Sequence, residues 1–190
     1  MRSIKLLLTA AYGTYPSEVA DSLAPLYVLC GAPGAGKTTL LPYLVAGARN
    51  LIVADMDEIL EDGRLLGVPI ASDDGRNHWP AYDRMWRRIV DLVRRTGSPV
   101  LLLRPTPSTG DLTPGLNWSE PTLWATLDCA DDERVRRLTG RGWSRGAIGD
   151  ALLDAANARD VLPTVIRSDE TELSTLAERI LAWATPTPHH

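Results

Sequence analysis

Short apolar runs alternate along the chain with longer stretches in which apolar positions recur every three or four residues. Five runs are apolar at nearly every position: Leu26–Cys30, Leu51–Ala54, Val100–Arg104, Leu123–Cys129 and Thr164–Arg167. Such runs are typical of strands that are covered on both faces. Their alternation with helical stretches indicates βαβ units. The pattern therefore predicts an α/β fold in three layers (α/β/α), with a five-stranded parallel sheet.

Two of the intervening stretches have a clear helical period. From Tyr82 to Val93, apolar side chains recur at helical spacing while arginine and aspartate occupy the other side. From Leu173 to Trp183, leucine, alanine and isoleucine repeat in the same way. Both patterns predict amphipathic helices that pack on the sheet.

The chain has 190 residues, enough for one well-buried core. We expect residues 26–185 to form a single domain, residues 1–25 an N-terminal arm of unassigned role, and residues 186–190 a disordered tail. The terminal His189 and His190 belong to that tail and are not expected to bind metal. The opening stretch resembles a weak signal peptide, but its apolar part is shorter than the roughly 7 residues that a signal core needs.

Charge and cysteine content limit the partners and the compartment. The formal net charge is -4, which argues against a nucleic-acid-binding surface. The two cysteines, Cys30 and Cys129, are too few for a disulfide framework or a four-cysteine zinc site, and each ends an apolar run. We expect buried reduced thiols, a cytoplasmic location, no membrane partner, and a monomer or homodimer.

A glycine-rich motif follows the first predicted strand. Gly31, Gly36, Lys37 and Thr38 satisfy the P-loop pattern G-x-x-x-x-G-K-[ST], and a helical stretch follows. Glycines let the backbone turn its N–H groups toward one anion, and the helix N-terminus adds its dipole. The predicted nucleotide-binding residues are Gly31, Ala32, Pro33, Gly34, Ala35, Gly36, Lys37, Thr38 and Thr39. Lys37 would contact the β and γ phosphates of ATP, and the Thr38 hydroxyl would bind Mg²⁺.

Two acids come at the end of the second predicted strand. Asp55 and Asp57 would lie at the carboxyl edge of the sheet, where ligands of open parallel sheets bind. One acid can hold the magnesium shell while the other accepts a hydroxyl proton. The alternative is an ordinary strand-to-helix turn in which Asp57 is the helix N-cap.

The order of P-loop, D-x-D on the second strand and a later arginine-rich segment resembles the P-loop small-molecule and nucleoside monophosphate kinases, which include shikimate, gluconate and adenylate kinases. The resemblance implies the P-loop NTPase fold with a short arginine-bearing lid. It also implies that Asp55 organises magnesium and that Asp57 contacts the acceptor. By the same likeness, Arg137 would stack on the adenine and Arg141 would reach the transferring phosphoryl group.

The sequence leaves open the roles of the other arginines and of the segment expected to bind the acceptor. Arg145 or Arg159 could complete the phosphoryl clamp, and solvent-exposed helix arginines are the alternative. Between Asp57 and the third predicted strand, His78, Trp79 and Tyr82 combine aromatic surface with polar tips, which suits a ring-bearing or hydroxylated acceptor. The alternative is that Trp79 covers the core and His78 is exposed. Arg76, Arg84 and Arg87 are candidates for binding an anionic group of the acceptor, and the sequence does not distinguish them.

The third predicted strand ends in Arg104, where many P-loop proteins have a magnesium-binding aspartate, and the nearest acid is Asp111. The P-loop, the two acids and the arginine-rich segment together predict, as the first function, an ATP- and Mg²⁺-dependent phosphotransferase with a small-molecule acceptor. In this prediction Lys37, Asp57 and Arg141 are catalytic. An ATP-binding regulatory or chaperone-like ATPase without such an acceptor is the alternative, and the missing aspartate favours it.

Overall fold

The protein is described here by a computed structural model that covers residues 23–70, 74–115 and 118–185. The predicted tail at residues 186–190 and most of the predicted N-terminal arm lie outside this part of the chain. The strands are β1 (Leu26–Cys30), β2 (Ile52–Asp55), β3 (Arg64–Leu65), β4 (Val68–Pro69), β5 (Val100–Arg104), β6 (Thr122–Asp128) and β7 (Val165–Arg167). The α-helices are α2 (Lys37–Gly47), α3 (Trp79–Arg94), α4 (Asp131–Gly140), α5 (Arg145–Val161) and α6 (Leu173–Trp183). Three short 3-10 helices are η1 (Met56–Ile59), η2 (Asp74–Asn77) and η3 (Thr109–Leu112).

The main sheet has five strands in the order β2-β5-β1-β6-β7, and every neighbouring pair is parallel. The predicted five-stranded parallel sheet is thus confirmed, with each strand within about two residues of its predicted limits. The antiparallel β3–β4 pair was not predicted. Its strands have two residues each, too few for an alternating pattern to be visible in the sequence.

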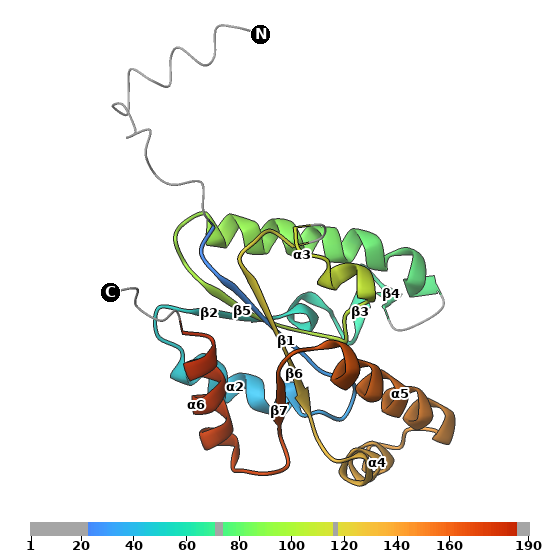
Figure 1. Ribbon diagram of the computed structural model, residues 1–190. Coiled ribbons are helices and arrows are strands. Elements are labelled where there is room, and N and C mark those ends of the chain that lie inside the picture. Colours follow the sequence, from blue (N-terminus) through green and yellow to red (C-terminus); the bar gives the residue numbers. More distant parts are fainter. Residues whose placement is uncertain (1–22, 71–73, 116–117, 186–190) are drawn as a thin grey trace, which may run out of the picture.

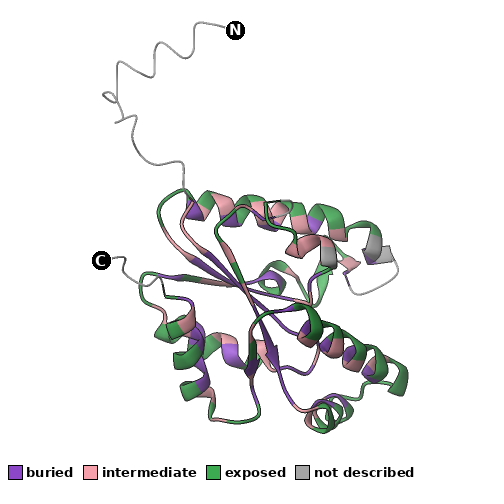
Figure 2. Cartoon of the chain, in the orientation of Figure 1, coloured by how far each residue is buried: buried purple, intermediate pink, exposed green. Residues whose placement is uncertain are grey.

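Helices cover both faces of the sheet, as expected for strands that are apolar on both sides (Figure 1). Alternate residues of β1 enter two different cores: Tyr27 and Leu29 pack with side chains of α2 and α6, whereas Leu26 and Val28 pack with those of α3 and α5. The strands are accordingly buried through the middle of the molecule (Figure 2). The three-layer prediction is confirmed.

Cys30 and Cys129 are both free and buried, as expected from the sequence. Burial raises the pKa of the Cys30 thiol to about 12, so the thiol stays protonated and behaves as a small apolar side chain. No helix in the described part of the chain combines the length and the apolar character needed to cross a bilayer.

Candidate active site

The glycine-rich segment forms a tight loop between β1 and the first residue of α2. Gly34 and Gly36 have φ angles of 83° and 102°, which L side chains rarely adopt. A Cβ at Gly31 would lie 3.0 Å from the carbonyl oxygen of Leu127, a tight contact with backbone, so the close approach to β6 also favours glycine. Gly36 is the N-cap of α2 and makes no side-chain cap, which leaves the first amides of this helix available to an anion.

Two arginines of α4 hold the outer side of this loop. Arg134 donates to the carbonyls of Ala32 and Pro33, and Arg137 donates to the carbonyl of Gly34 at 3.0 Å. The N–H and C=O of a trans peptide unit point in opposite directions. Because Arg134 binds the Pro33 carbonyl, the Gly34 amide of the same peptide unit turns away from α4. Pro33 has no N–H, and the Ala35 amide donates to the Ala32 carbonyl at 3.2 Å, which closes the turn of the loop.

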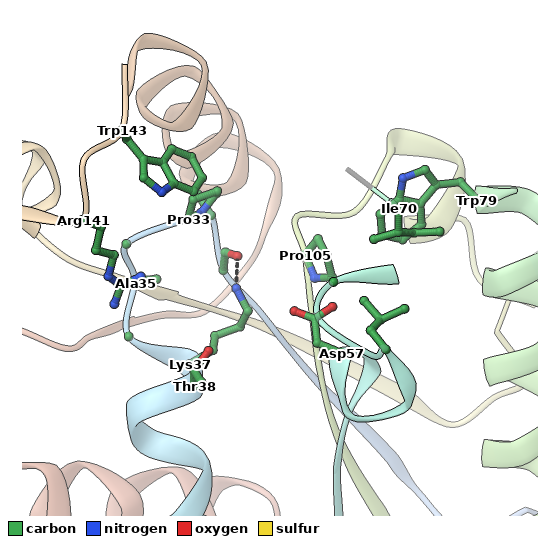
Figure 3. Close-up of a pocket in the computed structure, with 16 residues that line it drawn as sticks. Pro33, Ala35, Lys37, Thr38, Asp57, Ile70, Trp79, Pro105, Arg141 and Trp143 are labelled. Carbon is green, nitrogen blue, oxygen red and sulfur yellow. Dashed lines mark hydrogen bonds between the residues drawn. The ribbon is translucent and has the colours of Figure 1, made fainter. Parts of the chain in front are cut away.

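Lys37 lies at the start of α2 and faces the loop. Its Nζ donates to the carbonyl of Gly31. Burial lowers the pKa of Lys37, while the charges of Asp55 and Asp57 act in the opposite direction. Figure 3 shows the Lys37 side chain on one side of the cavity and the carboxylate of Asp57 on the other.

The two acids after β2 have different surroundings. Asp55 is only 5% exposed; its Oδ1 accepts a hydrogen bond from the Asp57 amide at 3.0 Å, and Glu58 Oε2 accepts one from the Asp55 amide at 2.7 Å. Asp55 is therefore the N-cap of η1, the role that the alternative interpretation of the sequence gave to Asp57. Burial raises the pKa of Asp55. Asp57 is exposed and lines the cavity, and Asp55 does not.

A cavity of about 490 Å³ lies between the loop and the segment that follows β2. The loop wall comprises every residue from Gly31 to Thr38. The remaining lining residues are Asp57, Leu60, Gly63, Ile70, Trp79, Pro105, Arg141 and Trp143. In Figure 3, Ile70 and Trp79 lie on the side opposite Trp143 and Arg141. The fold thus places the predicted Lys37, Thr38, Asp57 and Arg141 around one space.

A second cavity of about 360 Å³ lies on the other side of the loop. It is lined by Gly36 and Thr39, by Arg137 and Arg141 near the end of α4, and by residues of the segment that leads into α6, including Ser168. Arg137 Nη1 also reaches Ser168 Oγ at 3.2 Å, and its Nε is bound to Glu133. Arg141 borders both cavities, which is the position expected of a group that contacts phosphates between them.

The other candidate arginines lie elsewhere. Arg159 pairs with Asp128 and Asp131, and neither Arg145 nor Arg159 lines either cavity. Arg87 pairs with Asp83, and Arg84 lies on the exposed side of α3. The side chain of Arg76 lies outside the described part of the structure.

Comparison with known proteins identifies the family. No protein-family model matches the chain. A shikimate kinase of Saccharopolyspora erythraea is 30% identical over 170 residues, which cover 86% of this chain and 95% of the relative. The chain belongs to the shikimate kinase-like family of P-loop kinases. The resemblance stated from the sequence is thereby confirmed.

Solved structures share the fold of this chain. The tunicamycin resistance protein of Deinococcus radiodurans superposes with a TM-score of 0.62 at 19% identity, covering 86% of this chain and 97% of that chain. Shikimate kinase from Acinetobacter baumannii in complex with shikimate superposes with a TM-score of 0.54, also at 19% identity, covering 88% and 96%. At these identities the likeness concerns the fold alone.

A magnesium ion fits this shikimate kinase-like site only with the help of a bound phosphate. No group of three or more histidine, cysteine, aspartate or glutamate residues in the described chain could hold a metal. Mg²⁺ in kinases is typically held by one or two protein oxygens and by substrate phosphates. The exposed Thr38 and the carboxylates of Asp55 and Asp57 are donors of that kind, so the residues present fit a phosphate-dependent site.

The end of β5 differs from the sequence pattern of many P-loop proteins, as noted from the sequence. Arg104 lies 3.6 Å from Asp83 and 3.4 Å from Asp111, and Asp111 also accepts hydrogen bonds from Ser108. Ser108 is the N-cap of η3, and Asp111 completes its capping box and does not line the main cavity. Asp111 therefore does not take the place of the missing aspartate at this cavity.

Sequence reasoning missed three apolar residues of the main cavity: Leu60, Ile70 and Trp143. Leu60 and Ile70 belong to a segment without regular periodicity, so their shared cavity depends on tertiary structure. Trp143 carried a signal, because a tryptophan beside Gly142 in an otherwise polar segment is unusual, and it is 40% exposed in the structure.

Proposed function

We propose that this chain is an ATP- and Mg²⁺-dependent kinase that transfers the γ-phosphoryl group of ATP to a hydroxyl group of a small molecule. The observation that supports this proposal is the single cavity in which the P-loop faces Asp57. The relative with 30% identity is a shikimate kinase, an enzyme of the same class. A P-loop alone would fit many nucleotide-binding proteins, whereas a carboxylate across from the loop fits phosphoryl transfer to an acceptor.

The nucleotide would span the two cavities. The base would occupy the space beside Arg137 and Ser168, and the phosphates would pass Arg141 to reach the amides of the loop. Arg137 already donates hydrogen bonds to the loop and to Ser168, so its plane offers a surface for stacking while its position is fixed. Lys37 would then leave the Gly31 carbonyl and bind phosphate oxygens, which are stronger acceptors.

Asp57 would act on the acceptor. Its carboxylate orients the acceptor hydroxyl and takes its proton as the hydroxyl oxygen bonds to the γ-phosphorus. The bond between this phosphorus and the β–γ bridging oxygen breaks, and ADP leaves with the electron pair. Lys37 and Arg141 stabilise the charge on the phosphoryl oxygens. Bound Mg²⁺, held by Thr38 with Asp55 or Asp57 and the phosphates, would supply further charge neutralisation.

The test is ADP release from Mg²⁺-ATP by the purified protein, screened with nucleosides, nucleotides, sugars and other hydroxylated compounds. We expect an acceptor that stimulates ADP release in the wild type and not in Asp57→Asn. Asp62→Asn is the matched control, since Asp62 is exposed in the next segment and does not line the cavity. Turnover that needs no acceptor and survives in Asp57→Asn would instead identify the alternative ATPase.

A further inference from the structure

The acceptor half of the cavity is mainly apolar. Apart from the loop itself, the cavity is lined by Leu60, Ile70, Trp79 and Pro105, and Trp143 lies across from them on the side of Pro33 and Arg141 (Figure 3). Trp79 stands edge-on to Tyr82, with the ring centroids 5.6 Å apart, so its indole is held by the start of α3. Figure 3 shows the indoles of Trp79 and Trp143 on opposite sides of the cavity. Flat apolar surfaces on both sides suit a ring-bearing molecule.

The charged groups of this cavity are concentrated on the phosphate side. Among the described lining residues, the cations are Lys37 and Arg141, and the carboxylate is Asp57. Lys37 is bound to the loop and Arg141 borders the second cavity, so both serve the phosphates. An acceptor would therefore meet Asp57 as the charged group on its own side, and a carboxylate or phosphate on the acceptor would be repelled by it.

Among the described residues of α3 and β5, Arg87 and Arg104 are paired with carboxylates and line neither cavity. Asp83 of α3 pairs with both Arg87 and Arg104. The Arg104 side chain is only 7% exposed, and its guanidinium lies 5.6 Å and 5.8 Å from the ring centroids of Trp118 and Trp124. Arg104 thus lies in the layer between the sheet and α3, where it also pairs with Asp111. Arg64, from the β3–β4 pair, donates to the Gly67 carbonyl of its own turn.

We propose that the acceptor is an uncharged, ring-bearing alcohol whose apolar body lies between Trp79 and Trp143 and whose hydroxyl faces Asp57. This inference rests on the proposed kinase function. A polyhydroxylated sugar fits less well, because the described side chains of the apolar wall offer few hydrogen-bonding groups for its hydroxyls. A hydroxy acid such as shikimate fits less well, because its carboxylate would have no described arginine on the acceptor side.

The direct test is binding of four probes to the protein saturated with Mg²⁺ and a non-hydrolysable ATP analogue, measured by calorimetry. The probes are 2-(2-naphthyl)ethanol, hydroxy(2-naphthyl)acetic acid, shikimate and glucose. We expect the naphthyl alcohol to bind at least about tenfold more tightly than each of the others. Failure of the naphthyl alcohol to bind, or tighter binding of either acid or of glucose, would overturn the inference.

Variants test whether the naphthyl alcohol binds at this specific site or adsorbs non-specifically to apolar surface. Trp79→Ala should weaken binding of the naphthyl alcohol by about tenfold or more, and Trp79→Phe, which keeps a ring, should restore most of it. Leu60→Arg adds a cation to the apolar wall and should reverse the preference between the naphthyl alcohol and the naphthyl acid, whereas the neutral Leu60→Met should not. Unchanged preference in Leu60→Arg, with ATP-analogue binding intact, would contradict the proposed charge basis.

The same probes distinguish this inference from the proposed function. Stimulation of ADP release by an acid or a sugar, lost in Asp57→Asn, would support the kinase and refute the uncharged acceptor. Tight binding of the naphthyl alcohol without any acceptor-stimulated ADP release across the full screen would support the binding site and refute the kinase.

Discussion

Arg134 of α4 forms an ion pair with Asp128 at the end of β6, and the arginine side chain is completely buried beneath the phosphate loop. The same guanidinium donates to loop carbonyls, so one side chain joins the sheet, α4 and the P-loop. Asp128 also accepts from Arg159 and Arg167. The position of the loop is therefore fixed in part by charged groups that line neither cavity, whereas Arg137, which also binds the loop, lines the second one.

The first prediction concerns this pair. Arg134→Met should lower the free energy of unfolding by about 3 kcal/mol, because removing one partner leaves buried polar groups without their charge-assisted hydrogen bonds. Mg²⁺-ATP affinity should fall as well, since the loop carbonyls lose their support. Urea unfolding and calorimetry would measure the two effects. Arg179→Met, on the exposed side of α6, is the control; equal losses in both variants would contradict this account.

Lys37 provides a prediction about pH. Burial holds the pKa of Lys37 below its ordinary value of 10.5, and only the ammonium form attracts phosphate. As pH rises through the lowered pKa, the ammonium loses its proton, so Mg²⁺-ATP affinity should fall. Lys37→Arg keeps its charge and should show a flatter profile from about pH 7 to about pH 10. Lys37→Ala should weaken binding on the order of 100-fold at neutral pH.

Calorimetric titrations in buffers of different ionisation enthalpy would add a second measurement. Phosphate beside Lys37 raises the pKa of the ammonium, so binding should take up protons in the alkaline range in the wild type and not in Lys37→Arg. Profiles of equal slope in the two proteins would show that another group controls the pH dependence.

The sheet could be predicted because each strand has a recognisable apolar pattern in its own short segment of sequence. Val100–Arg104 is almost wholly apolar, as a strand buried on both faces must be, and its limits agree with β5. The P-loop could be predicted for a similar reason, since its glycines are required by backbone conformation. The β3–β4 pair could not, because Gly63 and Gly67 mark turns without showing which residues pair between them.

The cavity was only partly predictable, because its walls come from distant segments. Asp57 and Lys37 carried recognisable motifs, whereas Leu60, Ile70 and Trp143 meet across the cavity through the fold alone. The division of labour between the two acids was also hidden. A D-x-D pattern does not show that Asp55 turns inward to cap η1 while Asp57 faces the cavity.

Substitutions of Asp55 can separate its role in capping η1 from its proposed role in binding Mg²⁺. Asp55→Asn should keep the cap, since its side-chain oxygen can still accept from the Asp57 amide, whereas Asp55→Ala should cost about 1 kcal/mol. Burial raises the pKa of Asp55 above its ordinary 3.8, so the folded state holds this proton more tightly than the unfolded state. The ionised carboxylate therefore costs stability, and this cost appears as pH rises through the raised pKa.

The free energy of unfolding of Asp55→Asn, relative to that of the wild type, should accordingly increase as pH rises through the raised pKa of Asp55. Urea midpoints at about pH 5 and about pH 8 would test this sign. ATP affinity of Asp55→Asn should lose part of its dependence on Mg²⁺, because an amide is a weaker magnesium ligand than a carboxylate. Equal destabilisation by asparagine and alanine at both pH values would rule out the capping role.

Arg141 tests the link between the two cavities. It is exposed and borders both spaces, so Arg141→Ala should leave the free energy of unfolding nearly unchanged while lowering acceptor-stimulated ADP release on the order of 10³-fold, as expected for a guanidinium that stabilises transition-state charge. Arg141→Lys should recover a minor part, because a point charge cannot bind two phosphoryl oxygens in a fork. Arg145→Ala is the matched control, since Arg145 is also exposed and lines neither cavity. A comparable loss in Arg145→Ala would place the catalytic guanidinium at the start of α5 instead of at the end of α4.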